Sequence, residues 1–314
     1  MNGRVGLDGA APSPKLPTGT VSNASMSKII WRAGDGSAEL HPALIPLATA
    51  ARVAETPCGS GSMVWRVWGE GAPLVLLHGG SGSWRHWARN IGPLGQGRMV
   101  ISPDLPGLGD SAMPEGVSTP EGVAEILARG LDRILPAGSL YDLAGFSFGA
   151  LCSGHLAALD QDRVKSLTII GAGALGFQRS PTQLVKVRAL SGEERVAAHR
   201  HNLAELMFAD ASKIDDVALA IQEASTRGAR FKSRGFASTD SLKQALLCGR
   251  GQLNAIYGAW DAIVRPNVQW RLDLVHGLRP GARAHAIPGA GHWVAYEAAD
   301  AFNATLLRFL TEQA

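Results

Sequence analysis

One serine, Ser147, stands between Gly145 and Gly149 in the stretch LAGFSFGAL, directly after a short apolar run. A serine hydroxyl is a weak nucleophile at neutral pH unless its surroundings activate it. One arrangement that does so is a turn from strand to helix so sharp that only small residues fit beside it. This stretch therefore predicts an α/β fold with Ser147 exposed above a sheet. It also requires a histidine, a carboxylate and a second N–H donor elsewhere in the chain.

Strand-like and helix-like segments alternate along the chain, which favours a mostly parallel sheet flanked by helices. Residues 73–80 are continuously apolar up to their histidine and glycines, as expected of a strand covered on both faces. Residues 122–135 place their apolar side chains on one face of a helix, and 164–173 resemble the next strand. Residues 176–251 are helix-like, more polar and richer in Arg and Lys, which indicates an insertion between two strands.

These changes of character divide the chain into four predicted parts. They are an N-terminal extension over 1–60, the first part of the core over 61–175, a helical cap over 176–251 and the second part of the core over 252–314. We expect about the first 25 residues to be flexible, because they are rich in Gly, Pro, Ser and Ala. Residues 43–54 are expected to form an ordinary helix.

Composition limits the partners and the compartment. A net charge of +3 and a pI near 8.9 are too mild, and the charges too scattered, to indicate nucleic-acid binding. No run approaches the roughly 18 apolar residues that span a bilayer, and the N-terminus lacks the apolar core of a secretory signal. Cys58, Cys152 and Cys248 are odd in number and widely spaced, which argues against a disulfide framework and suits a cytoplasmic protein.

The same survey limits the cofactors. No His, Asp and Glu cluster has the spacing of metal ligands, so no metal is expected. GAGALG at 171–176 formally matches a dinucleotide-binding fingerprint, but the chain continues as FQRSP, where Pro181 would break an early helix. We therefore expect an enzyme that acts on a small-molecule substrate without a cofactor and without a nucleic-acid or membrane partner. A homodimer is a candidate assembly, and a nicotinamide enzyme is the weaker alternative.

The histidine and the carboxylate are sought after Ser147. His292 lies in PGAGHW, a glycine-flanked loop that follows a strand and precedes the last helix. Asp261 ends AIYGAWD at the carboxyl end of a strand, where a carboxylate can accept the second ring N–H of His292 and fix its tautomer. Asp273 is a weaker rival because it lies within a helical pattern. His86 and His199 are among the histidines expected at the surface or as caps.

The second N–H donor is expected in the stretch LLHGGSGSWRHW. The N–H of Gly80 is well placed to form an oxyanion hole with the N–H of Phe148, the residue after the serine. Ser81 follows Gly80 and is a candidate for a hydroxyl contact to the substrate. His78, which ends the strand, is expected to be structural.

Five motifs together resemble the α/β-hydrolase fold superfamily. HGGSGSW, PDLPGLGDS, GFSFG, YGAWD and GHW occur in the order typical of that superfamily, and the resemblance covers about residues 63 to 314. It implies an eight-stranded sheet, a helical cap at 176–251 and a triad of Ser147, Asp261 and His292. The C-terminal stretch GHWVAYEAADAFNATLLRFL resembles the carbon–carbon bond hydrolases of aromatic-ring degradation and related esterases.

The sequence thus predicts a serine hydrolase. Carboxylic-ester hydrolysis is the first hypothesis, carbon–carbon hydrolysis of a diketone-like acid is the second, and a lyase of the same fold is less favoured. Ser81, Arg188 and Trp293 are the candidate substrate contacts. Arg188 is preferred among the basic residues near the cap entrance because its planar fork matches a carboxylate.

Overall fold

The computed structural model describes residues 29–36 and 39–312. The expected flexibility of the first 25 residues lies outside this range and stays a prediction. No helix in the described part of the chain is both long and apolar enough to cross a membrane.

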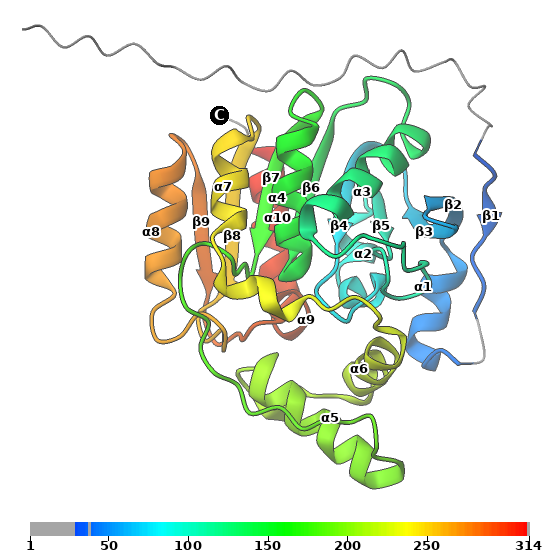
Figure 1. Ribbon diagram of the computed structural model, residues 1–314, viewed down its shortest axis with the longest axis vertical. Helices are drawn as coiled ribbons and strands as arrows, with labels where there is room; N and C mark the ends of the chain where they lie inside the picture. The colour runs from blue at the N-terminus through cyan, green and yellow to red at the C-terminus, as the bar shows by residue number, and fades with distance from the viewer. Residues whose placement is uncertain (1–28, 37–38, 313–314) are drawn as a thin grey trace, which may run out of the picture.

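One sheet organises the molecule (Figure 1). Its nine strands within the described residues follow the order β1-β2-β3-β5-β4-β6-β7-β8-β9, against the eight that the sequence predicted. Pairing is antiparallel from β1 through β3 to β5, and parallel from β5 to β9. The strands are β1 Arg32–Ala33, β2 Arg52–Cys58, β3 Gly61–Trp68, β4 Ala72–Leu77, β5 Arg98–Pro103, β6 Tyr141–Phe146, β7 Val164–Ile170, β8 Gln252–Gly258 and β9 Arg283–Ile287.

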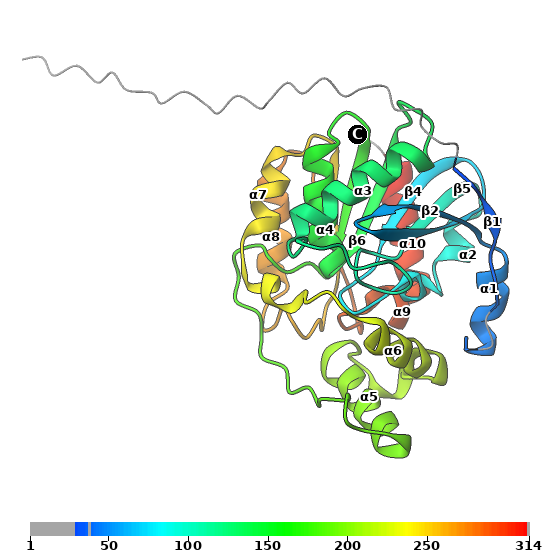
Figure 2. The same cartoon turned by 45° about the vertical axis from the view of Figure 1, so that its right-hand side comes forward.

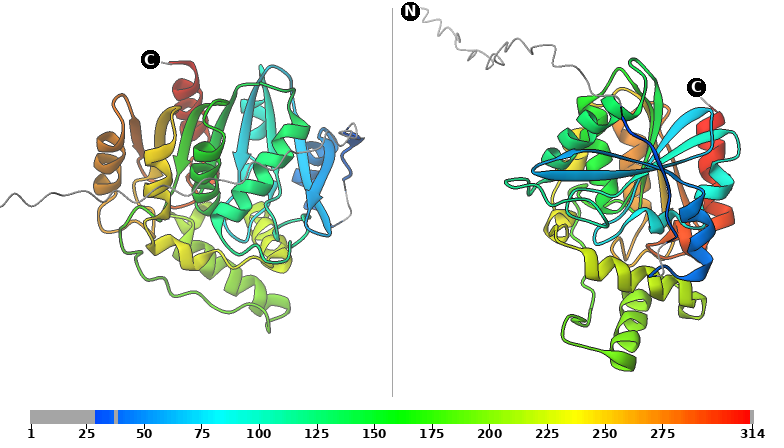
Figure 3. Two further views of the ribbon diagram at one scale, coloured as in Figure 1. Left: turned by 45° about the horizontal axis from the view of Figure 1, so that its top comes forward. Right: turned by 90° about the vertical axis from the view of Figure 1, so that its right-hand side faces the viewer.

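Helices cover both faces of this sheet (Figure 3). α3, α4, α7 and α8 contribute to one apolar core, and α1, α2, α9 and α10 to the other. The helices are α1 Ile45–Thr49, α2 Ile91–Leu94, α3 Pro120–Ile134, α4 Phe148–Leu159, α5 Gly192–Leu206, α6 Asp216–Gly228, α7 Ser241–Cys248, α8 Gln269–Leu278, α9 Val294–Glu297 and α10 Ala299–Thr311.

The N-terminal prediction needs a correction. The helix expected over 43–54 is only the short α1, and β2 begins at Arg52. β2 pairs with β3 along its whole length, from Arg52 opposite Val67 to Cys58 opposite Gly61. Residues 52–58 therefore belong to the sheet rather than to an extension. The apolar, alanine-rich run over 43–54 resembles one helix, which hid the start of the strand at Arg52. The strand forms because β3 pairs with it.

The segment between β7 and β8 has two kinds of helix. α7 packs against α4, where a Cβ on Gly154 would overlap Leu242, so it belongs to the layer over the sheet. α5 and α6 project from one end of the body (Figure 2). They are joined by Glu223 of α6, whose carboxylate accepts hydrogen bonds from Arg195 Nε at 2.7 Å and from His199 Nε2 at 2.6 Å.

The charge of Glu223 should stabilise this helix pair in a pH-dependent way. Burial alone would raise the pKa of Glu223, but its bonds from Arg195, Arg227 and His199 outweigh burial and lower the pKa to about 2. The unfolded value is about 4.3. A lowered pKa contributes stability that is present above the unfolded pKa and is lost as the pH falls towards the folded one.

We expect Glu223→Gln to lower the unfolding free energy by about 1 kcal/mol at pH 7, because a partly exposed carboxylate is screened by solvent. The difference from the parent should shrink as the pH falls from about 4.3 towards about 2, as measured by urea denaturation and by hydrogen exchange in α5 and α6. Glu125→Gln, which removes an exposed carboxylate 3.8 Å from Arg129, is the control with little expected effect. A Glu223 effect that does not change with pH would contradict this explanation.

Candidate active site

Ser147 occupies the turn from β6 to α4 in a strained backbone conformation. Its φ is 52° and its ψ is −114°, in the left-handed range that side-chain-bearing residues rarely adopt. A Cβ on Gly145 would overlap the carbonyl oxygen of Gly149, and a Cβ on Gly149 would overlap that of Leu77. The two glycines are therefore required where β6, α4 and β4 cross beneath the serine.

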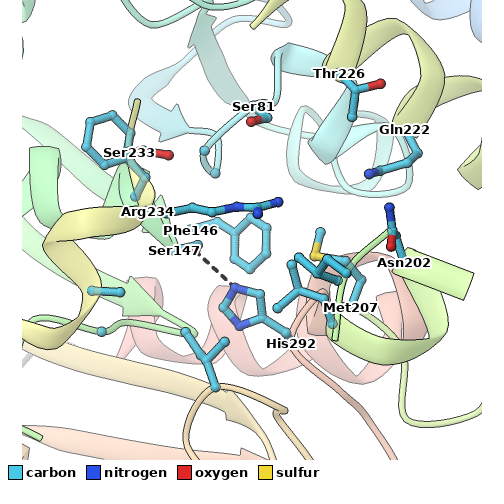
Figure 4. A pocket seen from close by; sticks show the side chains of 18 of the residues that line it. Ser81, Phe146, Ser147, Asn202, Met207, Gln222, Thr226, Ser233, Arg234 and His292 are labelled. Carbon is cyan, nitrogen blue, oxygen red and sulfur yellow. Dashed lines mark hydrogen bonds between the residues drawn. The ribbon is translucent and has the colours of Figure 1, made fainter. Parts of the chain in front are cut away.

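His292 and Asp261 complete a hydrogen-bonded chain with Ser147. His292 Nε2 lies 3.0 Å from Ser147 Oγ, as the dashed line in Figure 4 marks. Its Nδ1 lies 2.8 Å from Asp261 Oδ2. Asp261 is fully buried and His292 is 3% exposed. This geometry lets His292 accept the serine proton while the carboxylate orients the ring and stabilises its charged form.

The loops that carry these residues follow neighbouring parallel strands. Ser147 follows β6, Gly171 follows β7, Asp261 follows β8 and His292 follows β9. Gly171 has φ +53°, and a Cβ there would lie 3.1 Å from the His292 ring. The glycine-rich stretch at 171–176 thus makes room for the histidine, and no helix begins there. This explains the apparent dinucleotide fingerprint without a nucleotide. The rival acid, Asp273, is exposed in α8 and bonds Gln269.

A buried carboxylate that the sequence reasoning missed holds the histidine loop. Glu297 of α9 accepts the N–H groups of Gly291 at 2.6 Å and of Asp210 at 2.8 Å. The N–H of Trp293 donates to Met207 O at 2.8 Å. The loop is therefore fixed to the chain that leaves α5. The only sequence signal was an acidic residue in the otherwise apolar stretch VAYE.

The two expected oxyanion donors lie on facing segments. A Cβ on Gly80 would lie 3.5 Å from Phe148 Cβ, and one on Gly79 would lie 3.4 Å from Ser147 Cβ. Among the hydrogen bonds between described residues, neither the Gly80 N–H nor the Phe148 N–H has an acceptor. Both are free to receive negative charge that develops beside Ser147.

Two buried histidines position the loop that carries Gly80. His78 accepts the N–H of Leu105 at Nε2, 2.9 Å away, and its Nδ1 lies 2.8 Å from Gly79 O. His86 Nδ1 accepts the N–H of Gly79 at 3.3 Å. Burial lowers the pKa of His86 well below its ordinary value, and the neighbouring His78 and His292 lower it further. His86 and His199, which were expected at the surface or as caps, are instead both buried, and the surface alternative is wrong for each.

A cavity of about 400 Å³ opens above the serine. Ser81 and Arg188 line it, as their predicted contact with a substrate requires. Polar side chains of α5 and α6, Asn202, Gln222 and Thr226, face Ser147 and His292 across it (Figure 4).

Trp293 does not line this cavity, which corrects its prediction as a substrate contact. It is buried, donates from Nε1 to His86 O at 3.0 Å and stacks on Tyr296 with ring centroids 4.3 Å apart. The residue following His292 thus points into the core. Over residues 29–36 and 39–312, no group of three or more His, Cys, Asp or Glu could hold a metal ion.

Comparisons with known proteins identify the family of this chain. A model described as the alpha/beta hydrolase family matches residues 74–305. A 2-hydroxy-6-oxo-6-phenylhexa-2,4-dienoate hydrolase of Burkholderia cepacia is 30% identical over 269 residues, covering 77% of this chain and 88% of that protein. A 2-hydroxy-6-oxononadienedioate/2-hydroxy-6-oxononatrienedioate hydrolase of Comamonas testosteroni is 29% identical with the same two coverages.

The solved structures include a meta-cleavage product hydrolase from Pseudomonas fluorescens IP01. Its TM-score is 0.65 at 22% identity, and the match covers 82% of this chain and 97% of that chain. At this identity the likeness concerns the fold, and it confirms the fold class that the sequence predicted.

Asp261→Asn should disable the serine while leaving the fold intact. An asparagine cannot accept the ring N–H as a carboxylate does and favours the wrong histidine tautomer, which costs about 10⁴-fold in a comparable triad. We expect acylation of Ser147 by 4-nitrophenyl acetate to slow by about 10³–10⁴-fold, with unchanged circular dichroism. Asp273→Asn is the matched control and should acylate at the parent rate. Equal rates for parent and Asp261→Asn would remove Asp261 from this role.

Proposed function

This chain belongs to the alpha/beta hydrolase family, and on that premise we propose that Ser147, His292 and Asp261 are its catalytic triad. The observation that carries the proposal is the continuous chain of contacts from Asp261 Oδ2 through the His292 ring to Ser147 Oγ. These contacts supply a nucleophile, a base and an orienting acid in the order that acyl transfer requires.

The steps follow from the positions of these groups. Ser147 Oγ attacks a carbonyl carbon of the substrate as His292 Nε2 takes the hydroxyl proton. The N–H groups of Gly80 and Phe148 hold the resulting oxyanion. The tetrahedral intermediate then breaks its bond to the leaving group, which receives the proton from His292. Water, deprotonated by His292, attacks the acyl-enzyme, and the acid is released as Ser147 regains its proton.

For the bond cleaved, we propose a carbon–carbon bond. The two curated relatives described above are named as hydrolases of 2-hydroxy-6-oxo-dienoate-type acids, which moves this reaction ahead of the ester hydrolysis that the sequence placed first. In such compounds the bond from the 6-oxo carbon to its chain can break because the departing carbon is conjugated with the 2-hydroxydienoate system. Water then supplies a hydroxyl group to the acyl carbon and a proton to the departing carbon.

Ester hydrolysis is the second candidate, favoured by the chemistry of the site alone. An alkoxide is a better leaving group than a carbanion, and its departure needs only the proton that His292 already carries. The groups around Ser147 are sufficient for it without any electron sink in the substrate.

We also propose that the enzyme works in a reducing compartment such as the cytoplasm. Cys58 and Cys152 are buried free thiols and Cys248 is an exposed one. Free thiols are typical of proteins kept in such surroundings.

A paired substrate panel tests both the site and the bond. We expect the purified protein to consume 2-hydroxy-6-oxo-6-phenylhexa-2,4-dienoate, followed by its absorbance, with a kcat/KM at least tenfold above that for 4-nitrophenyl butyrate. Ser147→Ala should abolish both reactions, whereas Ser118→Ala, at an exposed serine, should change neither. Turnover of esters alone would favour the second candidate. Substantial activity in Ser147→Ala would contradict the proposed triad.

A further inference from the structure

The lining of the cavity above Ser147 carries positive charge and no carboxylate. It includes Arg179, Lys186, Arg188 and Arg234 but no Asp or Glu. None of these four side chains takes part in an ion pair between described residues. A concave site lined by charge of one sign concentrates ligands of the opposite sign.

Arg234 is presented by a segment that is fixed at both ends, residues 230–237, which we call the strap. The N–H groups of Arg230 and Phe231 donate to Gly107 O at 2.9 and 3.2 Å. At its other end Ala237 O accepts the N–H of Ala174 at 2.8 Å. The backbone of Arg234 is thus tied to two loops of the core rather than to the projecting helices.

The strap also packs against both expected oxyanion donors. The Phe231 ring lies 5.1 Å from the Phe148 ring, centroid to centroid. A Cβ on Gly80 would overlap Ser233 Oγ. From this position the Arg234 side chain extends into the cavity that Phe146, Ser147 and His292 also line (Figure 4). The Arg234 side chain makes no hydrogen bond to a described residue, so its five donors are available to a ligand.

Arg179 approaches the same space from the segment after β7. Its Nε is buried and has no hydrogen-bond partner among the described residues, while its Nη2 donates to Thr182 Oγ1 at 3.0 Å. Burial lowers the pKa of Arg179, the positive charge of Arg234 lowers it further, and the Asp261 carboxylate opposes both. Arg179 therefore lies within electrostatic reach of both Arg234 and the triad. Two positive charges in a partly buried site repel each other, and an anion bound between them would neutralise this repulsion.

We propose that Arg179 and Arg234 together bind a carboxylate of the substrate, in the same cavity in which Ser147 attacks its carbonyl group. The substrate class is then a small acid whose carboxylate and reactive carbonyl belong to the same short molecule. This proposal rests on the proposed function and deepens it.

Arg188, which the sequence favoured as the carboxylate anchor, is placed differently. Like Arg234 it is exposed, but its segment is bonded to α5: Asn202 Nδ2 donates to Val185 O at 2.9 Å and Arg195 Nη1 to Val187 O at 2.7 Å. It has no bond to the strap or to the core loops that carry the triad. Arg188 therefore serves as the comparison in the experiment.

Binding to a protein that cannot turn over separates this proposal from the reaction. In a Ser147→Ala background, hexanoate and hexanamide have the same length and differ in charge, and their affinities are measured by isothermal titration calorimetry. We expect hexanoate to bind at least tenfold more tightly. Arg234→Gln and Arg179→Gln should each reduce that preference to within twofold. Arg234→Lys should retain part of it, because lysine keeps the charge but lacks the planar guanidinium group. Arg188→Gln should retain all of it.

Three results would overturn the proposal. They are no preference for hexanoate in the background protein, a preference that survives Arg234→Gln, or a preference lost equally in Arg188→Gln. Arg234 is exposed and unbonded, so its glutamine variant should fold, and an unchanged melting temperature checks this even if Arg179→Gln fails to fold. A protein that hydrolyses neither dienoates nor esters, yet shows the Arg234-dependent preference, would support the carboxylate subsite and contradict the proposed function.

Discussion

The crossing of β6, α4 and β4 beneath Ser147 is the constraint on which the rest of the site depends. It forces the serine to φ 52°, a conformation that costs a side-chain-bearing residue about 1–3 kcal/mol. The neighbouring glycines, Gly145 and Gly149, permit the crossing because any side chain there would overlap backbone oxygens. The strain is held in place by buried strands on both sides. The same conformation places the hydroxyl above the sheet, within hydrogen-bond distance of His292 Nε2.

The parallel half of the sheet then brings distant residues to one edge. β4, β6, β7, β8 and β9 are consecutive neighbours, so the loops after them are adjacent although they are far apart in the chain. Gly80, Ser147, Asp261 and His292 each belong to one of these loops, and Gly171 leaves space among them. Glu297 adds a link from the histidine loop to the cap. The sheet strands thus position the residues proposed to react, and the insertion with its strap supplies most of the other side chains that line the cavity.

The sequence was sufficient to predict those parts of the site that follow from a local residue pattern. Ser147, Asp261 and His292 each end a strand-like run beside glycines, which is why their order and placement could be predicted and why the structure brings them together. It was insufficient where a long-range contact decides. β2 is a strand because β3 pairs with it, and Trp293 turns inward because the ring of Tyr296 receives it. Arg234 faces the cavity because two remote loops anchor its strap, and no spacing in the sequence records that.

The most direct test of the account is covalent labelling of the serine. A fluorophosphonate reacts only with a hydroxyl that a neighbouring base activates, and it leaves a mass that peptide mass spectrometry can locate. The account predicts a single addition, found in the peptide that contains Ser147 and absent when Asp261 is replaced by Asn over the same exposure time. Folded protein that stays unlabelled, or that carries the label at Ser81 or Ser233 instead, would contradict it.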